Sequence, residues 1–369
     1  MDYSQIAFDR AANTDFIKTL QKRVRKYFKE EGVSRYGNFE MYSKTVVMVS
    51  IYLVPYFLMM THVITNTWGV LAMWFIMGVG MAGVGMGVMH DACHGSFSKI
   101  NWINKLVGNI IILVGGNANN WKTQHNVLHH TFTNVTGADE DIESAIIRLS
   151  PRQEWKKIHK NQHVYAWFLY GLMTLMWSTT KDFKQISRYR KMGLLEQQNI
   201  NYSTEIVKLI VSKIFYYILF LVIPMMFFPG AWYVILLGYI LMHYVAGFIL
   251  AIVFQPAHVL PDVDFPNPNK DGTIENNWAV HQLRTTSDFA HENKILSWFL
   301  GGLNYQVEHH LFPTICHVHY KKLAKIVKET ADEFQIPYHK EKTFAAAIVK
   351  HGQMLKKLGK EKYFEEAHS

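Results

Sequence analysis

Two long stretches of this sequence contain no charged side chain. No Asp, Glu, Lys or Arg occurs from Thr45 to His90 or from Ile214 to Pro261. One helix needs about 20 apolar residues to cross about 30 Å of hydrocarbon, so each stretch is long enough for two crossings. Soluble helices average about 11 residues, which makes a pair of apolar core helices the weaker explanation. The pattern therefore predicts two transmembrane helical hairpins.

Both stretches are interrupted by residues that favour turns. The segment THVITNTWG at 61–69 is partly polar, and the FPG triplet at 228–230 breaks helix continuity. Two hairpins place the amino terminus, the middle and the carboxyl terminus of the chain on one side of the membrane. Lys and Arg gather in these segments, as in QKRVRKYFKE and SRYRK, and are absent from both turns. The positive-inside rule predicts that this side is cytoplasmic, in a bacterial inner membrane or the endoplasmic reticulum.

The predicted fold class is an all-α integral membrane protein with four transmembrane helices and a cytosolic helical cap. Apolar stretches beginning at Leu106 and Val164 are too short to span and are expected to lie in the interface or against the protein. The predicted segments are a basic cytosolic or interfacial segment at 1–44, the first hairpin at 45–89, a cytosolic middle at 90–213, the second hairpin at 214–257 and a cytosolic carboxyl-terminal region at 258–369.

The first of these segments places apolar residues four positions apart. Phe16, Leu20, Val24 and Phe28 alternate with basic residues, which describes a helix with one apolar face. That face suits the membrane surface. It suits the protein's own cytosolic part nearly as well.

Composition narrows the class of partner. The net charge of +9 accompanies only 18% charged residues, and no nucleic-acid motif is present. We therefore expect anionic lipid, acidic proteins or phosphorylated substrates as partners rather than nucleic acid. No cleavable signal peptide is recognisable in the charged first thirty residues.

Cys93 and Cys316 are expected to be packing residues in the cytosol, where a disulfide is not expected. The GVGMAG sequence at 78–83 matches a dinucleotide-binding pattern, but it lies inside an apolar helix and not after a strand, which excludes that function.

Seven of the nineteen histidines fall into three tight clusters. Histidines four apart share a helix face and can direct their imidazole nitrogens at one point, whereas adjacent histidines diverge by about 100° and can serve two neighbouring metal ions. Single histidines such as His62 and His243 are more simply hydrogen-bonded packing residues. The clusters are HDACH with His90 and His94, HNVLHH with His125, His129 and His130, and QVEHH with His309 and His310.

These clusters predict a two-metal site in the cytosolic cap. Gln306 lies three and four residues before the adjacent histidines, on the same helix face, and His258 follows the last predicted span. A nearly all-nitrogen ligand set disfavours magnesium and calcium and leaves iron, zinc or copper. Asp91, Asp139 and Asp141 are candidates to hold ligand N–H groups rather than to bind metal.

The three clusters resemble the histidine boxes of the membrane fatty acid desaturases, and a glutamine opening the third box resembles the front-end subgroup. Similarity runs from about His90 to Tyr320 and includes HHTFTNVTGADEDIE and WAVHQLRTTSDFA. The resemblance implies a di-iron enzyme with two Fe²⁺ ions. It would use O₂ and two electrons to insert a cis double bond into a fatty acyl chain carried by coenzyme A or a phospholipid.

The resemblance also implies which residues bind the irons. By position, the ligands are the seven box histidines together with His258. Gln306 stands where many desaturases have a histidine, so we expect it to act in the metal site or its immediate surroundings. The regiochemistry implied for a front-end enzyme is a new bond between an existing double bond and the carboxyl end.

Electrons are expected to come from a separate protein. Many front-end desaturases carry a fused cytochrome b5 domain with an HPGG motif, and no such motif occurs here. Cytochrome b5, or a ferredoxin with its reductase, would suit, and the basic surface could bind an acidic carrier.

Two alternatives remain at this stage. A hydroxylase or ketolase with the same boxes would add oxygen to the chain instead of removing hydrogen. A non-catalytic membrane metal-binding or transport protein would place histidines or acids along a path within the spans, whereas these clusters gather outside them.

Overall fold

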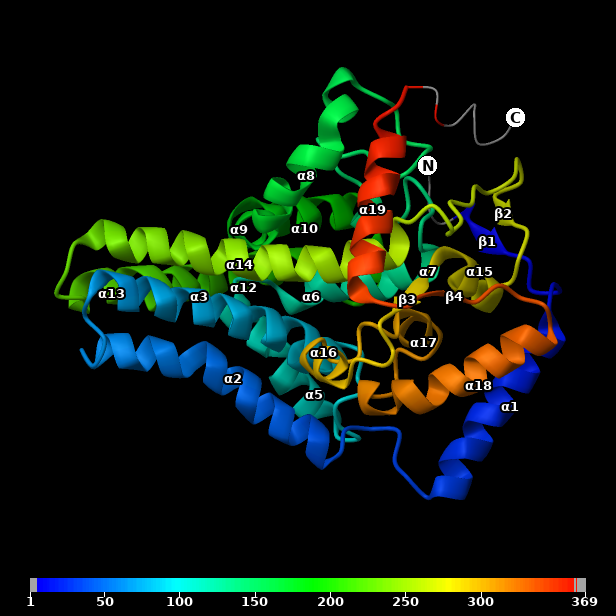
Figure 1. Ribbon diagram of the computed structural model, residues 1–369, viewed down its shortest axis with the longest axis horizontal. Coiled ribbons are helices and arrows are strands. Elements are labelled where there is room, and N and C mark those ends of the chain that lie inside the picture. The colour runs from blue at the N-terminus through cyan, green and yellow to red at the C-terminus, as the bar shows by residue number, and fades with distance from the viewer. Residues whose placement is uncertain (1–4, 362, 364–369) are drawn as a thin grey trace. The chain divides into compact units, whose positions relative to one another are not determined.

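The computed structural model describes residues 5–361 and Tyr363, and it is mostly helical (Figure 1). Four helices are long and apolar enough to cross a membrane, and their mean hydropathy lies between 1.5 and 2.3. This confirms the predicted fold class. The first and last of these helices are α2 (Phe39–Met60) and α14 (Trp232–His258). The second, at Thr67–Cys93, consists of α3 (Thr67–Val84), a π-helical turn (Gly85–Met89) and α4 (His90–Cys93). The third, at Tyr202–Phe227, consists of α12 (Tyr202–Tyr217), a π-helical turn (Ile218–Val222) and α13 (Ile223–Phe227).

The chain forms two compact units, and unit 2 comprises residues 39–123 and 167–251. Unit 2 contains most of the residues of the four long apolar helices. Its shorter elements are α5 (Asn101–Gly108), a 3₁₀ helix (Asn109–Val114), α6 (Ala118–Lys122), α9 (Met173–Met176), a π-helical turn (Trp177–Lys181), α10 (Asp182–Lys191) and α11 (Leu194–Gln197).

The turns of the two hairpins lie where the sequence predicts them. Asn66 ends the first turn, and its side-chain oxygen accepts from the backbone N–H of Gly69 at 2.8 Å, which caps α3. Phe228 to Ala231 separate α13 from α14. Between α12 and α14, the Tyr216 hydroxyl lies 2.8 Å from Nε2 of His243, so His243 is the hydrogen-bonded packing residue that was expected.

Small residues on α3 allow its neighbours to approach closely. A Cβ atom added to Gly80 would lie 2.5 Å from the backbone nitrogen of Tyr52 on α2, and one on Gly78 would lie 2.7 Å from the carbonyl oxygen of Met242 on α14. Figure 1 shows α2 and α3 side by side. The GVGMAG sequence is therefore a helix-packing surface.

Two of the long helices begin earlier than the charge-free stretches indicate. Helix α2 includes Lys44, which is fully buried, and α12 includes Lys213. Nζ of Lys213 lies 2.6 Å from the carboxylate of Asp182 and 2.8 Å from the carbonyl oxygen of Trp177. A buried lysine with such partners extends α12 beyond the boundary that charge alone predicts.

Unit 1 comprises 1–38, 124–166 and 252–369. Two short parallel strand pairs join distant parts of it: β1 (Ala7–Phe8) with β2 (Thr273–Ile274), and β3 (Ser287–Phe289) with β4 (His339–Glu341). Its helical elements, two of which continue into unit 2, are α1 (Thr14–Glu31), a π-helical turn (Thr123–His129), α7 (His130–Phe132), 3₁₀ turns (Glu140–Ile142, Lys157–Asn161 and His317–His319), α8 (Gln162–Gly171), α15 (Trp278–Thr285), α16 (Lys294–Phe299), α17 (Gln306–Leu311), α18 (Tyr320–Glu333) and α19 (Phe344–Leu358).

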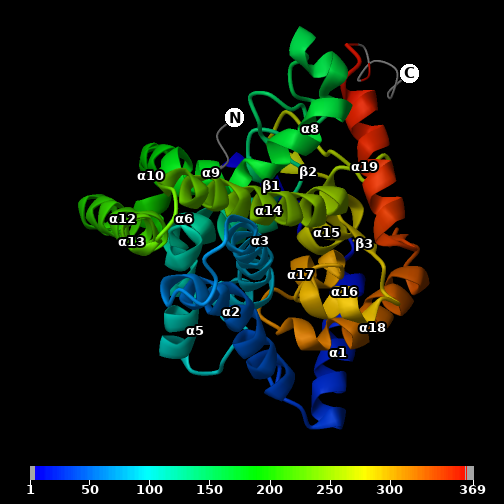
Figure 2. The ribbon, with the colours of Figure 1, turned by 60° about the vertical axis from the view of Figure 1, so that its left-hand side comes forward.

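The amino-terminal helix packs inside unit 1. Phe16, Leu20 and Val24 of α1 are at most 5% exposed and belong to one hydrophobic cluster with residues of α15, α17 and α18. Figure 2 shows α1 beside α18. The apolar face of α1 is therefore covered by protein, which is the alternative that the sequence left open.

Candidate metal centre

Six buried histidines gather within unit 1. They come from three parts of the chain: the turn at Thr123–His129 with α7, the last residue of α14, and α17. None is more than 4% exposed. Burying so many imidazoles in one place is costly unless their nitrogens are satisfied, which points to a metal site. They are His125, His129, His130, His258, His309 and His310.

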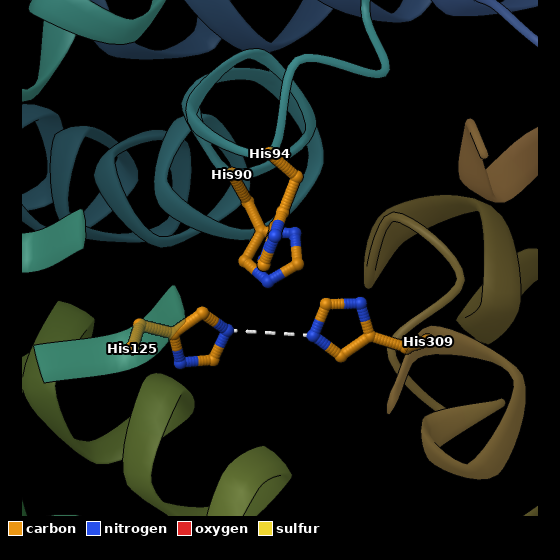
Figure 3. A group of neighbouring side chains, drawn as sticks. All are labelled: His90, His94, His125 and His309. Carbon is orange, nitrogen blue, oxygen red and sulfur yellow. Dashed lines mark hydrogen bonds between the residues drawn. The ribbon is translucent and has the colours of Figure 1, made fainter. Parts of the chain in front are cut away.

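Three of the rings direct their Nε2 atoms at one another. The Nε2 of His130 lies 2.9 Å from that of His309 and 3.2 Å from that of His125, and the His125–His309 separation is 3.4 Å. Figure 3 shows the facing nitrogens of His125 and His309. Two nitrogens bound about 2.1 Å from one ion at right angles lie about 3.0 Å apart. The three nitrogens therefore have the spacing of ligands that share an ion.

A second group brings together His129, His258 and His310, with candidate ligand atoms within 4.8 Å of one another. Each ring is held through its Nδ1. The acceptors are the carboxylate of Asp139 at 3.1 Å, the carbonyl oxygen of Thr285 at 3.4 Å and the side-chain oxygen of Gln282 at 2.8 Å, respectively. An imidazole that donates from Nδ1 keeps its lone pair on Nε2, the form that binds a metal ion.

Asp139 is the strongest of these supports. It is fully buried, and its oxygens also accept from the backbone N–H groups of Asn134 and Asp141, each at 2.9 Å. Burial alone would lower the pKa of His129, but the nearby carboxylates of Asp139 and Asp141 outweigh it and raise the pKa to about 9. The same carboxylates make the His129 ring a more basic ligand.

Gln282 on α15 contacts the histidine clusters and was not singled out from the sequence. Its oxygen lies 2.8 Å from both Nδ1 of His310 and the hydroxyl of Thr133, and its amide donates to the carbonyl oxygen of His130 at 3.2 Å. It thus connects the second and third histidine clusters. A single glutamine within WAVHQLRTT has no spacing that could have identified it.

Gln306 begins α17, the helix that carries His309 and His310. It is fully buried, and both polar atoms of its amide have no hydrogen-bond partner among the residues that the structure describes. An unpartnered buried amide costs free energy unless another group satisfies it. This fits a glutamine that faces a metal ion or a ligand of the metal site.

The first cluster belongs to unit 2 and has its own geometry. His90 begins α4, His94 follows its end, and the ring centroids of the two lie 4.7 Å apart. Figure 3 shows both rings projecting from one helical segment. Both pack edge-on against Trp121, and Nδ1 of His90 lies 3.6 Å from the carboxylate of Asp91. The spacing of four does produce the paired imidazoles that it predicts.

One group of buried imidazoles with converging Nε2 atoms, together with a second group held through Nδ1, is well suited to transition-metal ions. The same residues fall inside a match to the fatty acid desaturase family that covers residues 66–342. This chain belongs to the fatty acid desaturase family. The enzyme is accordingly a desaturase, and its four long apolar helices make it a multi-pass membrane protein.

Curated relatives align with the desaturase over nearly its whole length. It is 34% identical over 356 residues to an sn-1 linoleoyl-lipid 6-desaturase of Arthrospira platensis, with 96% of this chain and 95% of the relative covered. An sn-1 linoleoyl-lipid 6-desaturase of Synechocystis is 33% identical, with 94% and 96% covered. An acyl-lipid (8-3)-desaturase of Physcomitrium patens is 33% identical over 95% of this chain and 72% of the relative.

Proposed function

We propose that this desaturase is a front-end enzyme that acts on acyl chains carried by membrane lipids. It would insert a cis double bond between an existing double bond and the carboxyl end. The observation that carries this proposal is the near full-length alignment with relatives whose names specify lipid-bound chains, two of them for desaturation at position 6 of a linoleoyl chain. Position 6 lies on the carboxyl side of the first double bond of linoleoyl.

The proposed cofactor is a pair of iron ions, which would supply the activation of O₂ needed to remove hydrogen from unactivated methylenes. Six of the proposed ligands are the histidines gathered in unit 1, and the resemblance of HDACH to a desaturase histidine box adds the first cluster of unit 2. Gln306 is included because its buried amide lacks a partner among the described residues. The proposed ligands are His90, His94, His125, His129, His130, His258, Gln306, His309 and His310.

The residues of the chain have three tasks in this reaction. Asp139, Gln282 and the Thr285 carbonyl hold the imidazoles in the metal-binding tautomer. Burial of the six unit 1 histidines keeps bulk water from a strongly oxidising site. The apolar helices would hold the acyl chain so that one methylene pair is presented to the oxidant, which is the origin of regiochemistry.

The reaction requires two electrons from outside. Two adjacent methylenes of the acyl chain, O₂, two electrons and two protons yield the new double bond and two waters. We propose that a separate carrier, cytochrome b5 or a ferredoxin with its reductase, supplies the electrons on the cytoplasmic side. The distribution of Lys and Arg along the chain supports this orientation.

The test is mass spectrometry of lipids from a host that expresses the desaturase and is supplied with linoleate. We expect a new double bond near the carboxyl end, found in intact lipid and absent when His309 and His310 are both changed to Gln. His62→Gln is the matched control, because His62 lies in the turn before α3. Immunoblotting of membranes checks that each variant accumulates. A hydroxylated product would show that the enzyme is a hydroxylase and not a desaturase. If isotope-labelled acyl chains are desaturated only when they are supplied as acyl-CoA, the proposed lipid substrate is wrong.

A further inference from the structure

Unit 1 has a small cavity on the side of α18 that displays lysines. Its volume is about 150 Å³. Three of its lysines come from α18 at positions 321, 325 and 328, which lie on one helix face, and the fourth comes from β4. We name it the lysine pocket, and the residues used below are Lys321, Lys325, Lys328, Lys340, Tyr305 and Tyr338.

The lysine pocket has excess positive charge. Nζ of Lys328 lies 2.6 Å from the carboxylate of Asp332, and Glu292 is the one acidic residue that lines the cavity. The side chains at 321, 325 and 340 are exposed, and none has an ion pair among the described residues. Like charges four apart destabilise a helix, so an anionic partner at this face would relieve an unfavourable arrangement.

The lysine pocket is directly connected to the metal centre. Helix α18 begins at Tyr320, whose hydroxyl lies 3.3 Å from Nδ1 of His309, and the next residue along the chain is Lys321. The carbonyl oxygen of Tyr305, another lining residue, accepts from the backbone N–H of His309 at 3.0 Å. Two short routes made of covalent and hydrogen bonds therefore lead from the lining to one of the central imidazoles. Electrons tunnel more readily along such routes than across gaps.

The size of the cavity limits its occupant. Sites for drug-sized organic molecules typically measure about 300–1,000 Å³, so a coenzyme A moiety is too large for it. A single carboxylate side chain is a suitable size. A protein surface with several acidic residues could insert one carboxylate and place the others near the rim lysines.

We propose that the lysine pocket is the docking site for an acidic one-electron carrier protein. This inference rests on the proposed function, which requires external electrons. Two carriers dock in succession, each is oxidised by one electron, and the two electrons enter through the His309 side of the centre. Together with two protons and the two hydrogens of the acyl chain they reduce one O₂ to two waters.

The experiment uses the full chain in lipid nanodiscs with reduced cytochrome b5 haem domain as the probe. The variant changes Lys321, Lys325 and Lys340 together to Gln. The control changes Lys18, Lys22 and Lys29 to Gln, which removes the same charge from exposed positions of α1. Four measurements are made: the Kd for oxidised carrier from a binding titration, which is expected to change with the KM for carrier, the KM for carrier itself, the KM for lipid, and the olefin yield of a single turnover after anaerobic chemical reduction and mixing with O₂.

We expect the pocket variant to raise the KM for carrier about tenfold, because three favourable charge pairs are lost. Its salt dependence should also become flatter. Single-turnover yield and the KM for lipid should equal those of the wild type, and a triple Lys→Arg variant should restore carrier KM.

Several results would overturn the docking site. An equal rise in carrier KM for the α1 control would reduce the effect to overall charge. A change confined to the KM for lipid would reassign the pocket to an anionic lipid headgroup. A loss of single-turnover yield in the Gln variant that Arg does not restore would show a structural role. If the wild type itself forms no olefin in the single turnover, the proposed function fails and the docking proposal fails with it.

Discussion

Replacing Gln282 by Ala tests whether the metal centre depends on the glutamine that joins two histidine clusters. The side chain is fully buried and makes contacts of 2.8 Å to Nδ1 of His310, 2.8 Å to the Thr133 hydroxyl and 3.2 Å to the His130 carbonyl oxygen. Alanine removes all three. The imidazole of His310 then loses the acceptor that holds its tautomer.

The magnitude follows from these contacts. Losing the group that orients a ligating histidine typically lowers metal affinity or activity about 10- to 100-fold, which corresponds to about 1.4 to 2.7 kcal/mol. Each buried polar group left unpaired costs about 1–3 kcal/mol of folding free energy in addition. We therefore expect weaker metal binding, proportionally lower turnover and a lower melting temperature. Gln282→Glu should retain more metal, because a carboxylate still accepts from His310 although it cannot donate to His130.

The matched control is Gln162→Ala. Gln162 is also fully buried in unit 1 and also makes three hydrogen bonds, to the backbone N–H and carbonyl of Arg148 and to the carbonyl of Leu355. Its loss should lower the melting temperature and leave metal affinity unchanged. Metal per chain is measured by mass spectrometry across a chelator series. If Gln282→Ala binds metal and turns over like the wild type, its proposed role in orienting His310 is wrong.

Three further predictions concern other parts of the chain. Asp139→Asn should reduce metal affinity about 10- to 100-fold in the same chelator series, because the amide removes the charge that makes His129 basic; unchanged affinity would contradict this support. Gly80→Ala should reduce membrane accumulation measured by immunoblot, because its Cβ would overlap the α2 backbone, whereas Gly85→Ala, with its nearest contact at 3.6 Å, should accumulate normally. Lys213→Met should destabilise unit 2 by about 3–5 kcal/mol, because it leaves the buried carboxylate of Asp182 without its cationic partner. Adding Asp182→Asn should recover part of that loss in thermal unfolding. Equal melting temperatures for the single and double variants would refute the pairing.

Local pattern was sufficient for the membrane helices and for singling out most of the proposed ligands. Transfer of apolar side chains from water to hydrocarbon depends mainly on composition over about 20 residues, so long uncharged stretches predict spanning helices directly. Histidines four apart on a helix share a face whatever surrounds them. His90 and His94 could therefore be paired from their spacing, whereas His125 and His129 lie in a π-helical turn and belong to the two different groups.

The tertiary structure decided what the remaining polar and apolar groups contact. Sequence could not choose between lipid and protein for the apolar face of α1, because both satisfy the same hydrophobic effect, and the cluster with α18 made that choice. Helix α12 begins before the charge-free stretch because a buried lysine, Lys213, is costly only until a partner such as Asp182 lies beside it.

The supports of the imidazoles show the same limit. Gln282 and Thr285 act on His310 and His258, which lie 28 and 27 positions away in the chain. A hydrogen bond depends on a donor and an acceptor meeting at about 3 Å, and no local period reports such a meeting. The sequence by itself determined the class of protein and the chemistry of its ligands. Folding determined which groups hold those ligands in the form that can bind metal.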